Sequence, residues 1–279
     1  MAPYYEGRSN ACWRVSNGVV YIATGSSFVA EAIQSAESVK AAMPDKPVTM
    51  YSDRPVRADA IDSTHVRADF EQHRGDSIIR PDMMPYQRNL FLDTDTFVCT
   101  DLTEMFDALE RFDILVAHSP GREAVEGLPA CMAEFNTGVI AYRRTPAVAA
   151  CFDTWMDRFR AQYDRTGSAR NQASFTRAVW EVQPSMLVLP PEYNVRVPRA
   201  GYLNGPAKIV HGRHWHSLES VAARLNATDR RRVYYRDERI GPSDHRIVDR
   251  KGVLRLLRET IDTHGLRTGL RLAYRELRP

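Results

Sequence analysis

Strand and helix patterns alternate at the start of the chain, and this order limits the choice of fold more than any other feature. Residues 18–25 (GVVYIATG) form a short apolar run that ends in glycine. Residues 27–44 (SFVAEAIQSAESVKAAMP) place apolar side chains near helical spacing and stop at a proline. Residues 46–53 (KPVTMYSD) are typical of a second strand that ends in an acidic turn. A strand–helix–strand unit of this kind predicts an α/β protein.

The same alternation continues to about residue 215, and no internal repeat or low-complexity tract interrupts it. Further strands are expected at residues 64–68, 89–95, 113–120, 135–144, 185–195 and 207–212. Further helices are expected at residues 102–112, 146–163 and 171–181. We therefore predict an N-terminal extension over residues 1–17, one α/β domain over residues 18–223 and a separate tail over residues 224–279.

Composition fits a water-soluble globular domain, with 43% hydrophobic and 26% charged residues. The four cysteines have neither metal-ligand spacing nor a tight disulfide framework, and no apolar run is long enough to span a membrane. A cytoplasmic location is the expectation.

Positive charge is concentrated in the predicted tail, which holds 15 Lys or Arg against 8 Asp or Glu, although the whole chain has a net charge of only +3. Val253, Leu257 and Ile261 recur at helical spacing, as do residues 266, 270, 274 and 277. The pattern predicts a basic, partly amphipathic helical tail. Its basic face would meet the inner membrane surface or, less favoured, a nucleic acid; packing on the domain is the alternative.

Two aspartates, Asp93 and Asp95, end the apolar run in NLFLDTDTFV (residues 89–98). In a strand they would point to the same side, and such a pair is costly to bury without a cation. Three interpretations compete. The acids cap a turn or helix; they belong to a haloacid-dehalogenase-like phosphatase; or they hold a metal ion for nucleotide-sugar chemistry. The phosphatase motif fits poorly because Phe97 stands at its fifth position and no later GDxxxD follows.

The third interpretation is metal-assisted use of a nucleotide sugar. Negative charge builds on the nucleoside diphosphate as it leaves, and a divalent cation neutralises that charge as a Lewis acid. Hard cations prefer carboxylate oxygens, and ligands of open α/β sheets bind at the carboxyl ends of the strands.

Several motifs occur in a characteristic order: YQRNLFLDTDTFV, FNTGVIAYRR, NQASFTRAVW, VLPPEYNVR and KIVHGRHW. Together they resemble glycosyltransferases of the GT-A fold, and specifically the glycogenin-like and bacterial lipopolysaccharide galactosyltransferase group. The resemblance implies a Rossmann-like mixed sheet flanked by helices. It also implies an enzyme that transfers a sugar from a nucleotide-diphosphate donor, expected to be UDP-linked, to an acceptor hydroxyl with retention. The acceptor is not identified by the sequence.

The resemblance further implies that Asp93, Asp95 and His211 bind Mn²⁺ or Mg²⁺, with Asp93 also touching the ribose. The alternative for His211 is a hydrogen-bonded histidine at a strand end. Gly212 and Arg213 would meet the diphosphate, although HGRHW is more compressed than the motif of the family.

Thr24 and Asp53 follow the first two strands, where the family holds the base and ribose; a turn role for Asp53 is the alternative. Arg88 precedes the aspartate strand and would meet phosphate, with a surface ion pair as the alternative.

Asn136, Asn171 and Gln172 would bind sugar hydroxyls, and Asn136 and Gln172 would act in catalysis with the two aspartates. The family often has aspartate at position 171, and Asn171 is alternatively a helix N-cap. Glu134 and Glu192 are the candidates for a base if transfer inverts. A binding module that has lost catalysis is the rival function.

Overall fold

The computed structural model describes residues 16–70, 74–214, 216–235 and 240–242. Most of the predicted N-terminal extension and the amphipathic pattern predicted over residues 253–277 lie outside the described residues. Within the described part, no helix is long and apolar enough to cross a membrane.

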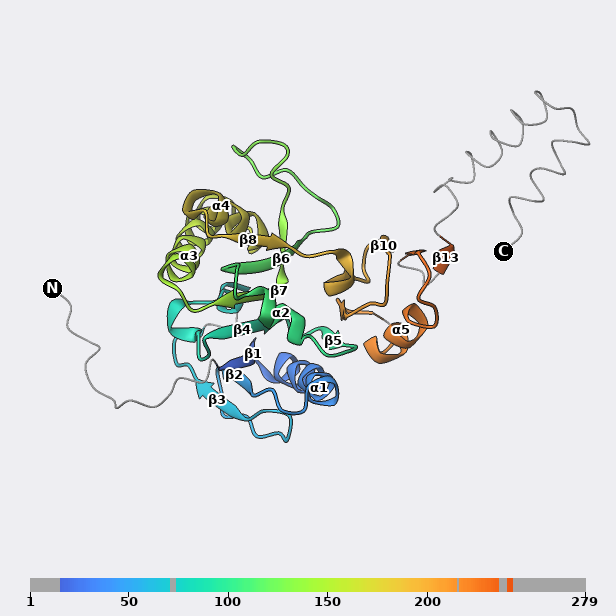
Figure 1. Cartoon of the computed structure of the whole chain (residues 1–279). Helices are drawn as coiled ribbons and strands as arrows, with labels where there is room; N and C mark the ends of the chain where they lie inside the picture. Colours follow the sequence, from blue (N-terminus) through green and yellow to red (C-terminus); the bar gives the residue numbers. More distant parts are fainter. Residues whose placement is uncertain (1–15, 71–73, 215, 236–239, 243–279) are drawn as a thin grey trace, which may run out of the picture.

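A seven-stranded mixed sheet forms the centre of the molecule, in the order β3-β2-β1-β4-β7-β6-β8 (Figure 1). Its strands are β1 (Asn17–Ala23), β2 (Val48–Ser52), β3 (Ser63–Val66), β4 (Arg88–Leu92), β6 (Ile114–His118), β7 (Phe135–Arg143) and β8 (Met186–Val188). The first four of these strands in chain order are parallel, whereas β7 runs antiparallel to both β4 and β6. The predicted mixed α/β sheet is confirmed.

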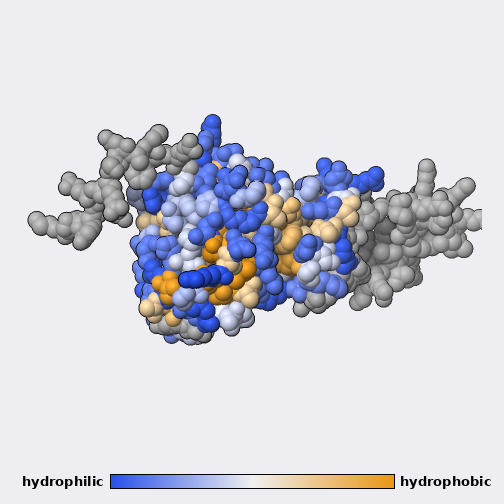
Figure 2. Space-filling view, turned by 90° about the horizontal axis from the view of Figure 1, so that it is seen from below, coloured by the Kyte–Doolittle hydropathy of each residue, from blue (hydrophilic) through white to orange (hydrophobic). Residues whose placement is uncertain are grey.

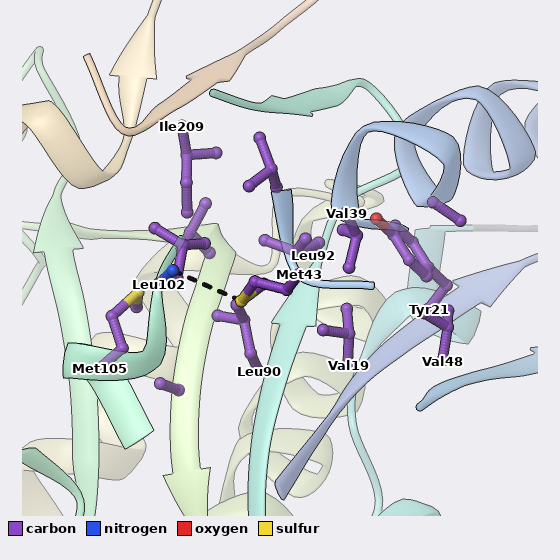
Figure 3. Close-up of a cluster of buried hydrophobic side chains, with 14 of the residues drawn as sticks. Val19, Tyr21, Val39, Met43, Val48, Leu90, Leu92, Leu102, Met105 and Ile209 are labelled. Atoms are coloured by element: carbon purple, nitrogen blue, oxygen red, sulfur yellow. Dashed lines mark hydrogen bonds between the residues drawn. The ribbon is translucent and has the colours of Figure 1, made fainter. Parts of the chain in front are cut away.

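Helices cover both faces of this sheet because its inner strands are apolar on both sides. In β1, Val19 and Tyr21 point into a cluster with α1 (Ser26–Ala42) and α2 (Thr103–Ala108), as Figure 3 shows for Val19 and Tyr21. The alternate residue Val20 points into a second cluster on the other face. That face is covered by α3 (Pro146–Thr166) and α4 (Gln172–Val182).

The first cluster also holds the end of α1 against the start of α2. The backbone N–H of Leu102 donates to Sδ of Met43 at 3.4 Å, the contact drawn in Figure 3. Both side chains are almost fully buried. This packing fixes the loop that leads away from the aspartate pair.

The aspartate pair lies in a turn and not in a strand, so the predicted strand over residues 89–95 is wrong at its end. β4 stops at Leu92, and the chain turns and enters β5 (Thr96–Val98). β5 belongs to a second sheet, β5-β11-β9, with β11 (Ile209–His211) and β9 (Val195–Arg196). Hydrogen bonds to other segments, and not strand alternation, therefore decide where the two carboxylates point.

A third small sheet, β10-β12-β13, follows beside α5 (Leu218–Leu225). Its strands are β10 (Gly201–Leu203), β12 (Arg232–Tyr234) and β13 (Ile240–Pro242). The expected boundary at residue 224 falls inside α5, and Leu225, Val233 and Tyr234 are buried. The described start of the predicted tail is thus a helix end and a strand packed on the domain, because its apolar side chains complete a core cluster.

Arg232 is an example of a basic tail residue with a structural role. Its side chain is buried and donates to the backbone oxygen of Arg230 and to Oδ1 of Asn226. Burial lowers the pKa of Arg232 below its usual value. This arginine does not contribute to a basic outer surface.

Short 3₁₀ turns connect the remaining elements: η1 (Arg74–Ser77), η2 (Pro81–Met83) and η3 (Pro191–Tyr193). The strand-like segment expected over residues 185–195 is therefore β8, η3 and the start of β9. Seen from the side of α1 and β3, the surface is largely hydrophilic, with apolar side chains exposed in places between the polar ones (Figure 2). Some exposed apolar area is ordinary for a soluble domain.

Candidate metal centre

Asp93, Asp95 and His211 converge at the end of β4. Their ligand atoms all lie within 4.8 Å of one another, and theirs is the one such group of His, Cys, Asp or Glu found within the described residues. Nε2 of His211 lies 3.4 Å from Oδ2 of Asp93 and 3.4 Å from Oδ1 of Asp95. The resemblance predicted these three residues as metal ligands, and the structure brings them together.

Backbone contacts from three segments shape the turn that carries the aspartates. The N–H of Asp93 donates to the carbonyl of Gly138 in β7 at 2.8 Å. The N–H of Gly212 donates to the carbonyl of Asp95 at 2.8 Å, and Oγ1 of Thr96 donates to the carbonyl of Asp93 at 2.8 Å. Because β11 pairs with β5 so that His211 faces Thr96, the imidazole lies next to the turn.

Gly138 leaves the space that the three ligands occupy. A Cβ atom at this position would come 2.0 Å from Cε1 of His211 and 2.6 Å from Oδ2 of Asp93. In the structure Gly138 makes room for the candidate ligands themselves.

Charge in the centre favours a cation. Burial raises the pKa of Asp95, but its contact with His211 and the nearby charges of Arg196 and Arg213 hold that pKa below its usual range. The side chain of His211 is 1% exposed, that of Asp95 13% and that of Asp93 37%. Two carboxylates and an imidazole nitrogen form a ligand set that suits Mn²⁺ or Mg²⁺, and the partial exposure of Asp93 leaves access for phosphate oxygens.

A chain of side-chain amides stands behind His211. Nδ1 of His211 lies 2.8 Å from Oδ1 of Asn194, and Nδ2 of Asn194 donates to Oδ1 of Asn136 at 2.8 Å. Nδ2 of Asn136 donates in turn to Oε1 of Gln172 at 2.7 Å. The two predicted sugar-binding residues, Asn136 and Gln172, are therefore connected to the candidate metal ligand.

Asn194 was missed by the sequence analysis. It lies in the quoted motif VLPPEYNVR, where a buried asparagine among apolar residues was the available signal. Buried amides need hydrogen-bond partners, which makes such a residue a marker of a polar network.

Asn171 occupies the N-cap position of α4, yet its side chain makes no capping bond. Its Oδ1 accepts from Oγ1 of Thr137 at 3.0 Å, and its Nδ2 donates to Oγ of Ser77 at 3.3 Å. The side chain thus connects β7 with η1, beside Gln172 and close to the amide chain.

Thr24 and Asp53 follow β1 and β2, at the same sheet edge as the aspartate turn. Oδ1 of Asp53 accepts from the N–H of Gly25 at 3.1 Å, and the carboxylate also pairs with Arg54. Hydrogen bonds from Arg54 lower the pKa of Asp53 to about 2. Asp53 therefore has the turn contacts of the alternative interpretation, and it lies at the same sheet edge as the aspartate turn.

The structure corrects the prediction made for Arg88. It begins β4, so the length of the strand separates it from Asp93. Its guanidinium donates to the carbonyl of Phe106 and pairs with Glu110 at 3.1 Å. The predicted phosphate contact is wrong, and the ion-pair alternative describes this residue.

Arg213 lies at the centre, where Nη1 is 3.8 Å from Oδ2 of Asp95. A bidentate pair with Glu31 of α1 holds it at 2.7 and 2.8 Å, and the guanidinium stacks over Phe28. Gly212 has φ +112°, and a Cβ there would come 2.6 Å from Cδ of Pro198. Gly212 thus provides a turn that only glycine makes easily, and this turn presents Arg213.

The two candidate bases differ. Oε1 of Glu192 accepts from the backbone N–H groups of Asn204 and Gly205, so it anchors a loop. Glu134 is buried, and its Oε2 pairs with Arg170 at 3.0 Å. Burial, followed by the carboxyl of Glu123, raises the pKa of Glu134 to about 7.

A groove of about 980 Å³ opens beside Asp95. It runs between α1, residues 94–99 and residues 213–214 and 216–219, and Glu31 and Arg213 line it together. Of the three candidate ligands, only Asp95 lines this groove.

Comparison with solved structures places this architecture among glycosyltransferases. WbbM, described as bifunctional, is 16% identical over 69% of this chain and 42% of its own, with a TM-score of 0.50. The glycosyltransferase GlyE of Streptococcus pneumoniae TIGR4 is 15% identical over 77% and 61%, with a TM-score of 0.53. The galactosyltransferase LgtC, solved with donor and acceptor sugar analogs, is 15% identical over 75% and 94%, with a TM-score of 0.51.

No protein-family model and no curated protein sequence matches the chain. The chain spans less than half of WbbM and about three fifths of GlyE. At these identities the likeness concerns the fold: the chain has the GT-A type fold of these glycosyltransferases.

Proposed function

We propose that the protein is a metal-dependent glycosyltransferase that moves a sugar from a nucleotide-diphosphate donor, UDP-linked, to an acceptor hydroxyl. The observation that carries the proposal is the convergence of Asp93, Asp95 and His211 at the carboxyl end of β4 in a GT-A type fold. The fold also favours this function over the phosphatase alternative.

Asp93, Asp95 and His211 would hold the ion, preferably Mn²⁺, which when bound supplies Lewis-acid neutralisation of the leaving diphosphate. The guanidinium of Arg213 would donate to phosphate oxygens from beside Asp95. Thr24 and Asp53 would contact the base and ribose from the ends of β1 and β2.

Sugar recognition would fall to the amides behind the centre. Asn136 is buried and bonded to Asn194 and Gln172, so Gln172 and Asn171 are the more accessible members of the group. Their side chains would hydrogen-bond sugar hydroxyls and orient the anomeric carbon.

Retention of configuration is the proposed outcome. Inversion needs a carboxylate base beside the acceptor, and Glu192 is occupied by two backbone N–H groups. Glu134 is the remaining candidate for such a base. A Glu134→Gln variant with unchanged turnover would support retention, and loss of turnover with the fold intact would support inversion.

We also propose a cytoplasmic location and a peripheral contact of the tail with an anionic membrane. The membrane contact rests on the excess of basic residues after residue 223, and 11 of the 15 Lys or Arg in that stretch lie outside the described residues.

The test is release of nucleoside diphosphate from a panel of nucleotide sugars by chelator-treated protein, with and without added Mn²⁺. Asp95→Asn should lower turnover by about 100-fold or more if the ion stabilises the transition state. Asp45→Asn, at an exposed aspartate remote from the centre, is the matched control. Donor binding without any metal-stimulated turnover would instead identify a binding module.

A further inference from the structure

We propose that the backbone N–H of Gly138 fixes the direction of the amide chain, and that Asn194 is thereby a positioning residue that aims Nε2 of His211 at the metal. The inference rests on the proposed metal site. It assigns a role to Asn194 that neither the resemblance nor the fold comparison supplies.

The direction of the chain follows from one group that can only donate. The N–H of Gly138 lies 3.2 Å from Oδ1 of Asn136, so the amide of Asn136 must present its oxygen at this point. The same oxygen accepts from Nδ2 of Asn194 at 2.8 Å. A rotated Asn194 amide would bring two oxygen atoms together, which is repulsive.

The oxygen of Asn194 consequently faces His211. Oδ1 of Asn194 only accepts, so Nδ1 of His211, at 2.8 Å, carries the hydrogen. In the neutral imidazole the lone pair is then on Nε2, which lies 3.4 Å from a carboxylate oxygen of each aspartate. Metal-binding histidines require this arrangement, with the second ring nitrogen held by an outer hydrogen bond.

Burial makes the chain hard to replace with water. Asn194 is 5% exposed, Asn136 6% and His211 1%. If the amide of Asn194 is removed, Nδ1–H of His211 loses its partner, and the ring is free to adopt the other tautomer.

The N–H of Gly138 also sets the orientation at the other end of the amide chain, where Asn136 meets Gln172. Because the oxygen of Asn136 faces Gly138, its nitrogen donates to Oε1 of Gln172 at 2.7 Å. The amide nitrogen of Gln172 takes no part in this hydrogen bond and points away from Asn136. We therefore expect Gln172 to act as a donor to substrate oxygen atoms.

The first test compares Asn194→Ala with Asn89→Ala, a matched control. Asn89 is also a fully buried amide, but it bonds to the backbone of Tyr86, away from the centre. Calorimetric titration with Mn²⁺ alone should show affinity weakened by about 10- to 100-fold in Asn194→Ala. Affinity should be unchanged in Asn89→Ala.

The hydrogen on Nδ1 is read from ¹⁵N NMR of metal-free protein, with the His211 signals identified from their loss in His211→Ala. Wild type should show a hydrogen on Nδ1 that is protected from exchange with water, and Asn194→Ala should lose this protection. Unchanged protection of Nδ1–H and unchanged Mn²⁺ affinity in Asn194→Ala would overturn the proposal. If Asn194→Ala does not fold, Asn194→Ser is measured in the same way.

A second variant separates the two ends of the chain. In Asn136→Asp one carboxylate oxygen still accepts from Gly138 and Asn194, but the other must accept from Gln172, whose amide would rotate. The Nδ1–H of His211 should stay protected as in wild type while the donor KM rises; loss of this protection would contradict the assigned direction. If wild-type protein binds no Mn²⁺, the proposed function fails, whereas the NMR comparison still decides the role of Asn194.

Discussion

Gly138 and His211 are packed so closely that a Cβ atom at residue 138 would come 2.0 Å from Cε1 of the imidazole ring. Glycine is thus required here by the side chain of a residue 73 positions later in the chain. The backbone of Gly138 has no positive φ, so the requirement is steric and not conformational. Gly138 connects the position of β7 in the main sheet with that of β11 in the second sheet.

Gly138→Ala should therefore abolish Mn²⁺ binding, because either the imidazole or the carboxylate of Asp93 must move. Calorimetric titration with Mn²⁺ measures this loss, and circular dichroism checks that the sheet persists. Gly205→Ala is the matched control, since a Cβ there meets no atom within 4 Å. Wild-type Mn²⁺ affinity in Gly138→Ala would show that the ion binds elsewhere.

The sequence predicted most of the central sheet because apolar runs and helical spacing are local signals. Segments 18–25 and 135–144 agree with β1 and β7 within a few residues. The sequence failed at the aspartate turn, where an apolar run and a D-x-D pattern look like one strand. Where β4 ends and β5 begins depends on hydrogen bonds to Gly138 and Gly212, which are distant in the sequence.

In the candidate site, too, the sequence identified some residues and missed those whose role depends on contacts between distant segments. Asp93 and Asp95 were singled out by their position at the end of an apolar run, and the resemblance supplied their role as metal ligands together with His211. Asn194 was not found, since its role depends on contacts with Asn136 and His211 that no spacing encodes. Arg88 was misplaced because proximity in sequence to Asp93 hides the length of a strand, which rises about 3.3 Å per residue.

Arg213→Ala should weaken donor binding and leave metal binding nearly unchanged. Its guanidinium is 60% exposed and pairs with Glu31, and an exposed pair contributes only about 0–1 kcal/mol to stability. A lost charge-assisted contact with phosphate corresponds to a KM increase of roughly 10- to 100-fold. Arg57→Ala, at an exposed arginine away from the centre, is the control. An unchanged donor KM would remove Arg213 from the phosphate site.

Glu134 should make the stability of the protein depend on pH. Its pKa is raised to about 7 by burial and by the neighbouring carboxyl of Glu123, from an ordinary value of 4.5. Between these values the folded protein holds a proton that the unfolded chain has released. The free energy of unfolding should therefore be larger near pH 5 and fall as the pH rises through 7.

Glu134→Gln should flatten this dependence, because glutamine keeps the shape of the neutral acid without titrating. Urea unfolding of both proteins between pH 5 and pH 8 measures the difference. Glu123→Gln provides a second check, since removal of the neighbouring carboxyl should move the fall in stability to lower pH. Identical pH profiles for wild type and Glu134→Gln would exclude a raised pKa for Glu134.

Two truncations should separate the packed part of the predicted tail from the rest. A chain ending at residue 223 loses Leu225, Val233 and Tyr234, which are 3%, 7% and 5% exposed. Each buried apolar side chain of this size contributes about 1.5–3 kcal/mol, so this chain should unfold at lower temperature or aggregate. A chain ending at residue 242 keeps all three and should keep metal-stimulated donor hydrolysis.

The chain ending at residue 242 also lacks nine of the basic residues of the tail, and each basic residue near an anionic surface contributes about 1 kcal/mol of binding. Full-length protein should therefore bind anionic vesicles at low salt, and the chain ending at residue 242 should bind them much more weakly. Equal vesicle binding by the two would end the proposal of membrane contact through the tail, and normal melting of the chain ending at residue 223 would contradict the structural role of residues 224–235.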